Sequence, residues 1–137
     1  MNILFFLTPK NDVALLYSDQ TLRQALEIME YHRYTAIPMI DRNGKYIGTV
    51  TEGDLLWTIK KGNHLSLKES EGIPILSIER RKDNKPVSIN TTMEDLMDKA
   101  INQNFVPVVD NVEHFIGIVT RKDIMQYFYR QLKKEES

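Results

Sequence analysis

The chain has 137 residues, of which 42% are hydrophobic and 27% are charged, and it contains no cysteine. This length fits one compact domain or two small units that share a core, and the composition excludes disordered, collagen-like and coiled-coil proteins. The lack of cysteine excludes a disulfide scaffold, a thiolate metal site and a cysteine nucleophile, and it fits a reducing compartment. The net charge of −1 offers no general attraction for nucleic acid or an anionic membrane.

The N-terminal apolar run Ile3–Leu7 is the first feature of the chain. It is too short for the core of a signal peptide, which needs about 7–15 apolar residues, or for a membrane span of about 20. We therefore predict a cytoplasmic protein.

A first set of elements follows between residues 13 and 61. A short strand is predicted at 13–17, and a helix begins at Thr21, which is spaced from Gln24 as in a capping box. Two strands then flank the turn Arg42–Lys45, whose Asn-Gly pair is a strong hairpin signal. A last helix is predicted to start near Asp54.

The region 62–84 is predicted to be a linker with one short helix near Ser77, and its charged run Glu79–Asp83 is interpreted as a solvated segment. After it the same elements return. We predict a strand at 86–89, a helix capped by Thr92, two strands, and a final helix that starts near Asp123.

The two halves repeat each other in sequence. Ile37–Asp41 matches Val106–Asp110, and Ile47–Asp54 matches Ile116–Asp123, and both matches have the same offset along the chain. This duplication predicts an α/β protein with repeat 1 at residues 3–61, a linker at 62–84, repeat 2 at 85–132 and a charged tail at 133–137.

Each matching block contains one strand with a proline, a second strand with a glycine, and a Thr-x-x-Asp sequence at its end. These paired blocks resemble a tandem CBS-domain pair, or Bateman module. The resemblance covers about residues 3–132. It implies two β-α-β-β-α repeats packed with pseudo-twofold symmetry, usually dimerised, with two clefts that hold adenosyl ligands.

In this family a cleft takes its base-contacting strands from one repeat and its Thr-x-x-Asp from the other. The resemblance implies a main cleft that contains Asp12, Val13, Ala14, Tyr34, Thr35, Ala36, Ile118, Thr120, Arg121, Lys122 and Asp123. It implies a second cleft that contains Asn84, Lys85, Asn104, Phe105, Thr49, Thr51, Glu52 and Asp54.

The chemistry of the main cleft suits a nucleotide. A carboxylate such as Asp123 accepts hydrogen bonds from ribose hydroxyls, and the helix that starts after Thr120 favours a phosphate beside Arg121 and Lys122. The alternative is that both threonines only cap their helices, with each aspartate facing the helix dipole. The second cleft has Glu52 and the bulky Phe105 at the matching positions, so we expect it to be weak or vacant.

The histidines, the tryptophan and the apolar helix stripes are interpreted as structural rather than as ligand-binding features. The three histidines, His32, His64 and His114, lack ligand-like spacing and are expected at the surface, so no metal site is predicted. Trp57 is expected in the core or in a dimer interface. The apolar stripes of the two terminal helices are interpreted as a homodimer interface, and they consist of Leu55, Leu56, Ile59, Ile124, Phe128 and Leu132.

The predicted function is a non-enzymatic sensor of an adenine nucleotide of the AMP, ADP or ATP type. It has no cofactor, and it signals through dimer geometry or through docking to an unidentified target protein. Within the family, segments such as Tyr34–Pro38 and Thr120–Lys122 also resemble stand-alone proteins that bind cyclic di-AMP. The retained Asp123 instead favours a free ribose diol. A cyclic di-AMP receptor and a ligand-free dimerisation scaffold are the alternatives.

Overall fold

The computed structural model describes residues 2–62 and 66–136. The chain is an α/β protein that divides into two compact units. We call Ala14–Asp83 the first-repeat unit. The residues up to Val13, together with the chain from Asn84 onward, form the second-repeat unit.

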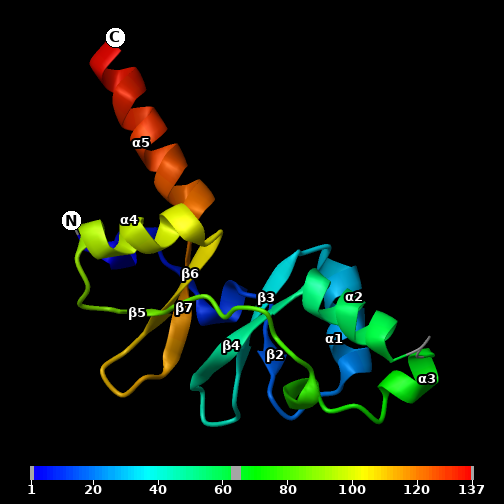
Figure 1. The fold of residues 1–137 in the computed structure, drawn as a ribbon. Helices are drawn as coiled ribbons and strands as arrows, with labels where there is room; N and C mark the ends of the chain where they lie inside the picture. The colour runs from blue at the N-terminus through cyan, green and yellow to red at the C-terminus, as the bar shows by residue number, and fades with distance from the viewer. Residues whose placement is uncertain (1, 63–65, 137) are drawn as a thin grey trace. The chain divides into compact units, whose positions relative to one another are not determined.

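The first-repeat unit is built on the three-stranded sheet β2-β3-β4, in which β2 is parallel to β3 and β3 is antiparallel to β4. Helices α1 and α2 lie beside this sheet (Figure 1), and Leu22, Ala25 and Leu55 enter its core. The elements are β2 (Leu16–Tyr17), α1 (Leu22–His32), β3 (Ala36–Ile40), β4 (Tyr46–Thr51), α2 (Glu52–Lys61), α3 (Leu67–Ser70) and η3 (Ile75–Ser77).

The second-repeat unit is built on the four-stranded sheet β1-β7-β6-β5. Its core contains Leu96, Val106 and Val119, and Ile3 and Phe6 from the N-terminal segment complete it. The elements are η1 (Ile3–Phe6), β1 (Thr8–Pro9), η2 (Lys10–Asp12), β5 (Val87–Ser88), α4 (Met93–Asn102), β6 (Phe105–Val109), β7 (Phe115–Thr120) and α5 (Arg121–Glu136).

The sequence duplication is reproduced in the hydrogen-bond register. In the β3–β4 pair Ala36 lies opposite Thr51, and in the β6–β7 pair the equivalent residues of the second repeat, Phe105 and Thr120, lie opposite each other. Both hairpins also have a register shift at the same place, before Ile40 and before Val109. Equivalent sequence therefore gives equivalent strand pairing.

Turns and caps follow the local sequence signals. The Asn-Gly hairpin prediction is confirmed, because Gly44 has φ 87° and its N–H donates to Asp41. Glu113 takes the equivalent place at φ 66°, a conformation that costs more for a residue with a side chain. The capping box of Thr21 and Gln24 and the cap of Thr92 are also present.

Several boundaries differ from the predicted ones. The strands predicted at 13–17 and 86–89 shrink to β2 and β5, and the last helix of each repeat begins two residues before its aspartate. The linker contains α3 in addition to the predicted turn of helix at Ser77. The predicted tail, as far as it is described, continues α5 to Glu136, because no glycine or proline interrupts the helix.

The N-terminal segment belongs to the second-repeat unit, although the sequence assigned it to repeat 1. Thr8 and Pro9 of β1 pair antiparallel with Ile118 and Gly117 of β7. They cover an outer sheet edge that would otherwise leave unpaired backbone groups. Among the described residues, no helix is long and apolar enough to cross a membrane.

We predict that Gly117→Ala destabilises the protein by about 1–3 kcal/mol. A Cβ at Gly117 would meet the carbonyl oxygen of Thr8, so β1 would have to move off β7. Urea unfolding measures the loss. The control is Gly53→Ala in α2, where the nearest atom to the new Cβ is 3.7 Å away. Equal losses for the two variants would contradict the prediction.

Candidate functional site

The start of α5 presents a set of polar groups in the second-repeat unit. The Asp123 N–H donates to Thr120 Oγ1 at 3.1 Å, so Thr120 caps the helix. The Asp123 carboxylate accepts no hydrogen bond from any described residue of the chain and is partly exposed, and Lys122 is exposed. The helix dipole, the cation and the open carboxylate together form a polar surface suited to a ligand.

The N-terminal segment lies against the same strand. Thr8 is the register partner of Ile118, and η2, which ends at Asp12, packs against β7. The structure therefore brings Asp12 and Val13 into the same unit as Ile118–Asp123. Of the residues predicted for the main cleft, Ala14, Tyr34, Thr35 and Ala36 belong to the first-repeat unit.

Arg121 is engaged elsewhere in its own unit. Its Nε donates to the carbonyl of Ala100 at 2.7 Å, and its Nη2 donates to that of Ile101 at 3.4 Å. The guanidinium thus satisfies two carbonyls of the last turn of α4. The phosphate contact predicted for Arg121 would require it to leave these carbonyls, so Lys122 is the better placed of the two cations to meet an anion.

Asp54, the counterpart of Asp123 in the first repeat, is used quite differently. Its Oδ2 accepts from the N–H of Thr51, and its Oδ1 accepts from that of Arg81, both at 3.0 Å. Its residue exposure is 4%. Asp54 completes a capping box and fastens the linker to α2, so both of its oxygens already have protein donors.

The linker is held a second time by Asp83. Its Oδ1 accepts from the N–H of Thr49 at 2.9 Å and from Arg80 Nε at 2.8 Å. Burial acts to raise the pKa of Asp83, but the hydrogen bonds from Arg80 and Thr49 outweigh it and hold the pKa below its usual value. Gly48 permits this approach, since a Cβ there would collide with the Asp83 carboxylate. Asp83 therefore clamps the linker to β4. Glu79, Arg81 and Lys82 are exposed, as expected for a solvated segment, whereas Arg80 and Asp83 are partly buried.

In the second-repeat unit, a buried glutamine binds residues that were predicted for the second cleft. Gln103 Oε1 accepts from the N–H of Lys85 at 2.8 Å, and Gln103 Nε2 donates to the Lys85 carbonyl at 3.1 Å. Asn84 Nδ2 donates to the carbonyl of Phe105. The donor and acceptor of the Lys85 backbone, which suit the edge of a nucleobase, are thus both bound by the side chain of Gln103.

The family comparison assigns the fold. The CBS-domain profile matches residues 7–61 and 77–130. The chain belongs to the CBS-domain family. Each repeat of the sequence is one CBS domain, and the two form the tandem pair that the sequence resembled.

Relatives with known names share this module. The chain is 30% identical over 112 residues to L-aspartate semialdehyde sulfurtransferase of Methanocaldococcus jannaschii, covering 82% of this chain but 20% of that protein. The crystal structure of CbpB in complex with c-di-AMP has a TM-score of 0.87 at 23% identity, over 99% of this chain and 89% of that one. CBSX2 in complex with AMP has a TM-score of 0.74 at 24% identity, over 96% and 98% of the two chains.

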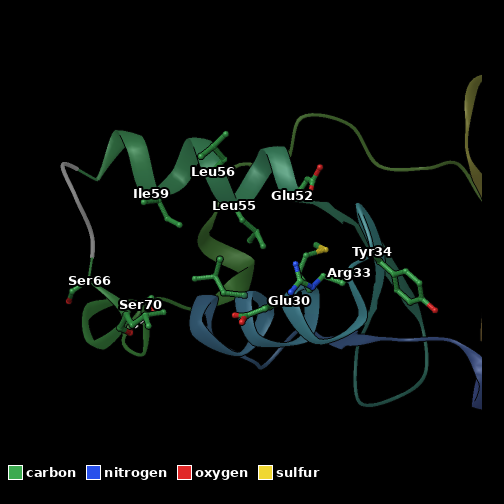
Figure 2. A pocket seen from close by; sticks show the side chains of 12 residues that line it. Glu30, Arg33, Tyr34, Glu52, Leu55, Leu56, Ile59, Ser66 and Ser70 are labelled. Atoms are coloured by element: carbon green, nitrogen blue, oxygen red, sulfur yellow. Dashed lines mark hydrogen bonds between the residues drawn. The ribbon is translucent and has the colours of Figure 1, made fainter.

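In the first CBS repeat, the predicted main-cleft residues Tyr34–Ala36 lie at the end of the β3–β4 hairpin where α2 begins. Thr35 O accepts from the N–H of Glu52 at 2.9 Å, and Ala36 is the register partner of Thr51. The Tyr34 ring stacks on His32 at 5.3 Å and is half-exposed at the mouth of a groove between α1 and α2 (Figure 2).

The other predicted residues are the histidines and Trp57, and each has its own outcome in the structure. His32 and His114 are exposed, as expected, whereas His64 lies outside the described residues. No cluster of three potential metal ligands occurs within residues 2–62 and 66–136. Trp57 is 54% exposed, which excludes the core, and its place in a dimer interface stays a prediction.

Sequence reasoning missed three groups that bind residues predicted for the second cleft: Gln103 in the second-repeat unit, and Asp83 and the Arg81 backbone in the first-repeat unit. One signal was available, because Asp83 follows Asp12 at the same separation at which Thr92 follows Thr21. The duplication therefore marks Asp83 as the counterpart of a predicted site residue.

We predict that Asp54→Ala and Asp123→Ala differ in stability. Asp54→Ala leaves two backbone N–H groups without their acceptor and should cost about 1–3 kcal/mol. Asp123→Ala removes only an acidic group near the helix dipole and should cost about 0.3–1 kcal/mol. Urea unfolding at neutral pH compares them, and a larger loss for Asp123→Ala would contradict the assignment of Asp54 as a structural clamp.

The Asp83 clamp predicts an acid-sensitive component of stability. Because the folded state lowers the pKa of Asp83, its contribution is present above the unfolded pKa of about 3.9 and is lost as pH falls through the folded pKa. The stability difference between the wild type and Asp83→Asn should therefore be largest at neutral pH and shrink below about pH 4. Urea unfolding over a pH series measures it. A difference that grows on acidification would have the wrong sign.

Proposed function

We propose that this CBS pair is a non-enzymatic sensor that binds one adenosyl nucleotide in its main cleft. Asp12–Ala14, Thr35 and Ala36 would contact the base, Asp123 the ribose, and Thr120 and Lys122 the phosphate. A sensor of this kind responds to its ligand through a change in conformational populations. A cytoplasmic location is part of the proposal.

The observation that carries the proposal is the contrast between the two aspartates of the Thr-x-x-Asp motifs. The Asp54 carboxylate is buried and accepts two backbone hydrogen bonds, whereas the Asp123 carboxylate is partly exposed and accepts none from the described residues. An open carboxylate beside a helix N-terminus and an exposed lysine supplies an acceptor for ribose hydroxyls and donors for a phosphate. These are the groups that a nucleotide requires.

The same contrast supports one ligand per chain. In the second cleft the backbone of Lys85 is paired with Gln103, and the Thr49 N–H with Asp83. Phe105 is buried, and Glu52 adds a negative charge. A ligand there would have to displace hydrogen bonds that the chain already makes, so its binding would be weakened.

An AMP, ADP or ATP type of ligand fits Asp123 best, because these nucleotides keep both ribose hydroxyls as donors. The structural similarity to AMP-bound CBSX2 is consistent with it. Cyclic di-AMP is the second candidate, and the observation that favours it is the similarity to CbpB, which was crystallised with this ligand and has the higher TM-score.

The signal would pass to other molecules. We propose a homodimer and a regulated target protein, because exposed apolar side chains remain on the helices of both units. We also propose that the chain has no catalytic activity of its own and no partner of the nucleic-acid class, given its net charge of −1. A ligand-free dimerisation scaffold is the alternative that the following experiment tests.

We predict that an adenosyl nucleotide raises the melting temperature of the wild-type protein. A ligand at 100 times its dissociation constant adds about 2.7 kcal/mol of stability, which corresponds to a shift of several degrees. Thermal unfolding should be compared with AMP, ADP, ATP, S-adenosylmethionine and cyclic di-AMP, with GMP as a base-specificity control. No shift with any of them would support the scaffold instead.

Variants assign the site in the same experiment. Asp123→Ala should remove the shift caused by a mononucleotide but spare one caused by cyclic di-AMP, in which one hydroxyl of each ribose is esterified. Lys122→Ala should reduce both shifts. Asp98→Ala, an exposed acidic residue on α4, is the control and should change neither. Unchanged binding by Asp123→Ala and Lys122→Ala would refute the proposed main cleft.

A further inference from the structure

Trp57 lies on the face of α2 that is opposite the apolar stripe of this helix. Leu55 and Ile59 of the stripe point toward α1 (Figure 2), whereas Trp57 and Lys61 line a separate hollow, as the helical spacing of these residues requires. The indole ring is half-exposed. At the equivalent position the second repeat has Gln126, so a CBS repeat does not need an aromatic ring here to fold. Neither the core nor the apolar stripe explains this tryptophan.

The hollow beside Trp57 has a volume of about 390 Å³ and lies between α2 and residues 79–81 of the linker. Hydrogen bonds within the first-repeat unit hold its two walls together. The Arg81 N–H donates to the Asp54 carboxylate at 3.0 Å, and Thr58 Oγ1 donates to the Asp54 carbonyl at 2.8 Å. The hollow is therefore a formed cavity of a size that suits a small molecule.

Two charged side chains of the hollow already have partners inside the fold. Arg80 donates to both carboxylate oxygens of Asp83, from Nε at 2.8 Å and from Nη2 at 3.3 Å. The Asp54 carboxylate accepts its two backbone N–H groups. The Arg81 side chain, in contrast, is exposed and makes no hydrogen bond or ion pair with any described residue. Its guanidinium is the cation of the hollow that is open to a ligand.

Two lysines add positive charge around the indole ring. Lys60 Nζ lies 5.2 Å from the centroid of the Trp57 ring. Lys61 Nζ lies 3.2 Å from a carboxylate oxygen of Glu79, but the two side chains are 71% and 83% exposed. Such a solvent-exposed pair contributes little to stability, so Lys61 can exchange Glu79 for another anion. The hollow thus combines an aromatic surface with two cations that an anionic ligand can reach, Lys61 and Arg81.

We propose that this hollow is a second ligand site, which binds a small anion with a planar aromatic ring. The ring packs on the indole of Trp57, and the carboxylate or phosphate group of the ligand binds the guanidinium of Arg81, whose planar fork matches either group. Lys61 supplies the second cation. The site lies wholly within the first-repeat unit and does not use Asp123, so it is independent of the nucleotide site proposed above.

Trp57 is the only tryptophan of the chain, so its fluorescence reports on this hollow directly. The wild-type protein is titrated at constant ionic strength with phenyl phosphate and with benzoate, which are ring-bearing anions. Inorganic phosphate and phenol, which each carry one half of the proposed chemistry, are titrated in parallel. We expect a saturable change in emission with a ring-bearing anion, at a concentration about fivefold below that needed for either half. The stronger of phenyl phosphate and benzoate identifies the anionic group.

Variants assign the contacts of the ligand. Arg81→Gln keeps the backbone N–H that Asp54 accepts and should weaken binding of the ring-bearing anion about fivefold. Lys82→Gln is the matched control, because it removes the neighbouring exposed cation, which does not line the hollow, and it should leave binding unchanged. Lys61→Gln provides a second test if Arg81→Gln fails to fold. Trp57→Gln copies the second repeat and should abolish binding, measured by isothermal titration calorimetry.

Three outcomes would overturn the proposal: equal affinities for the ring-bearing anions and their halves, equal weakening by Arg81→Gln and Lys82→Gln, or Trp57 emission that acrylamide does not quench. The last result would place the ring in a contact with another molecule. Asp123→Ala should bind the ring-bearing anion like the wild type, and a loss in this variant would place the anion in the nucleotide site instead. A response to phenyl phosphate without any response to nucleotides would refute the proposed nucleotide sensor alone.

Discussion

The outer edge of the last strand in each repeat is the constraint on which the rest of the structure depends. Such an edge carries backbone N–H and C=O groups that need partners. At β7 the backbone of Thr8 and Pro9 supplies them, and at β4 the Asp83 carboxylate accepts from the N–H of Thr49. In both cases the partner comes from the segment that precedes the other repeat.

This exchange explains why the compact units do not coincide with the sequence repeats. The unit boundaries fall after Val13 and after Asp83, which occupy nearly equivalent places in the duplication. Gly48 and Gly117 make the exchange sterically possible, because a side chain at either position would collide with the segment that covers the strand. Each repeat is completed by a short piece of chain from beyond its own borders.

Much of the fold was predictable because its signals are local and occur twice. The capping box at Thr21, the Asn-Gly turn and the constant offset between the repeats each specify a geometry that neighbouring residues determine. The predicted strands 13–17 and 86–89 were too long, since only Leu16–Tyr17 and Val87–Ser88 pair with a neighbouring strand. Strand length depends on what lies alongside, and local sequence does not contain that information.

The candidate site was predictable only as a set of residues, and their chemical states depend on contacts distant in sequence. Asp54 and Asp123 occupy the same motif position, yet the Asp54 carboxylate accepts a hydrogen bond from the N–H of Arg81, which is 27 residues away along the chain. Arg121 was expected to face an anion, but its guanidinium donates to the carbonyls at the end of α4. A motif therefore fixes where a side chain stands, and the surrounding fold decides whether it is free to bind.

The divergence between the two repeats has a thermodynamic consequence for a sensor. If the residues proposed to hold one ligand are divided between the two compact units, the bound state requires both units to present them together. A ligand shifts an equilibrium only as far as its affinities for the two states differ. The hydrogen bonds of Asp54, Asp83 and Gln103 hold the residues predicted for the second cleft, each within its own unit, and a ligand at those residues would have to break them. Under the proposed function, the asymmetry concentrates the response to nucleotide at Asp123, because of the two motif aspartates only its carboxylate accepts no hydrogen bond from the described residues.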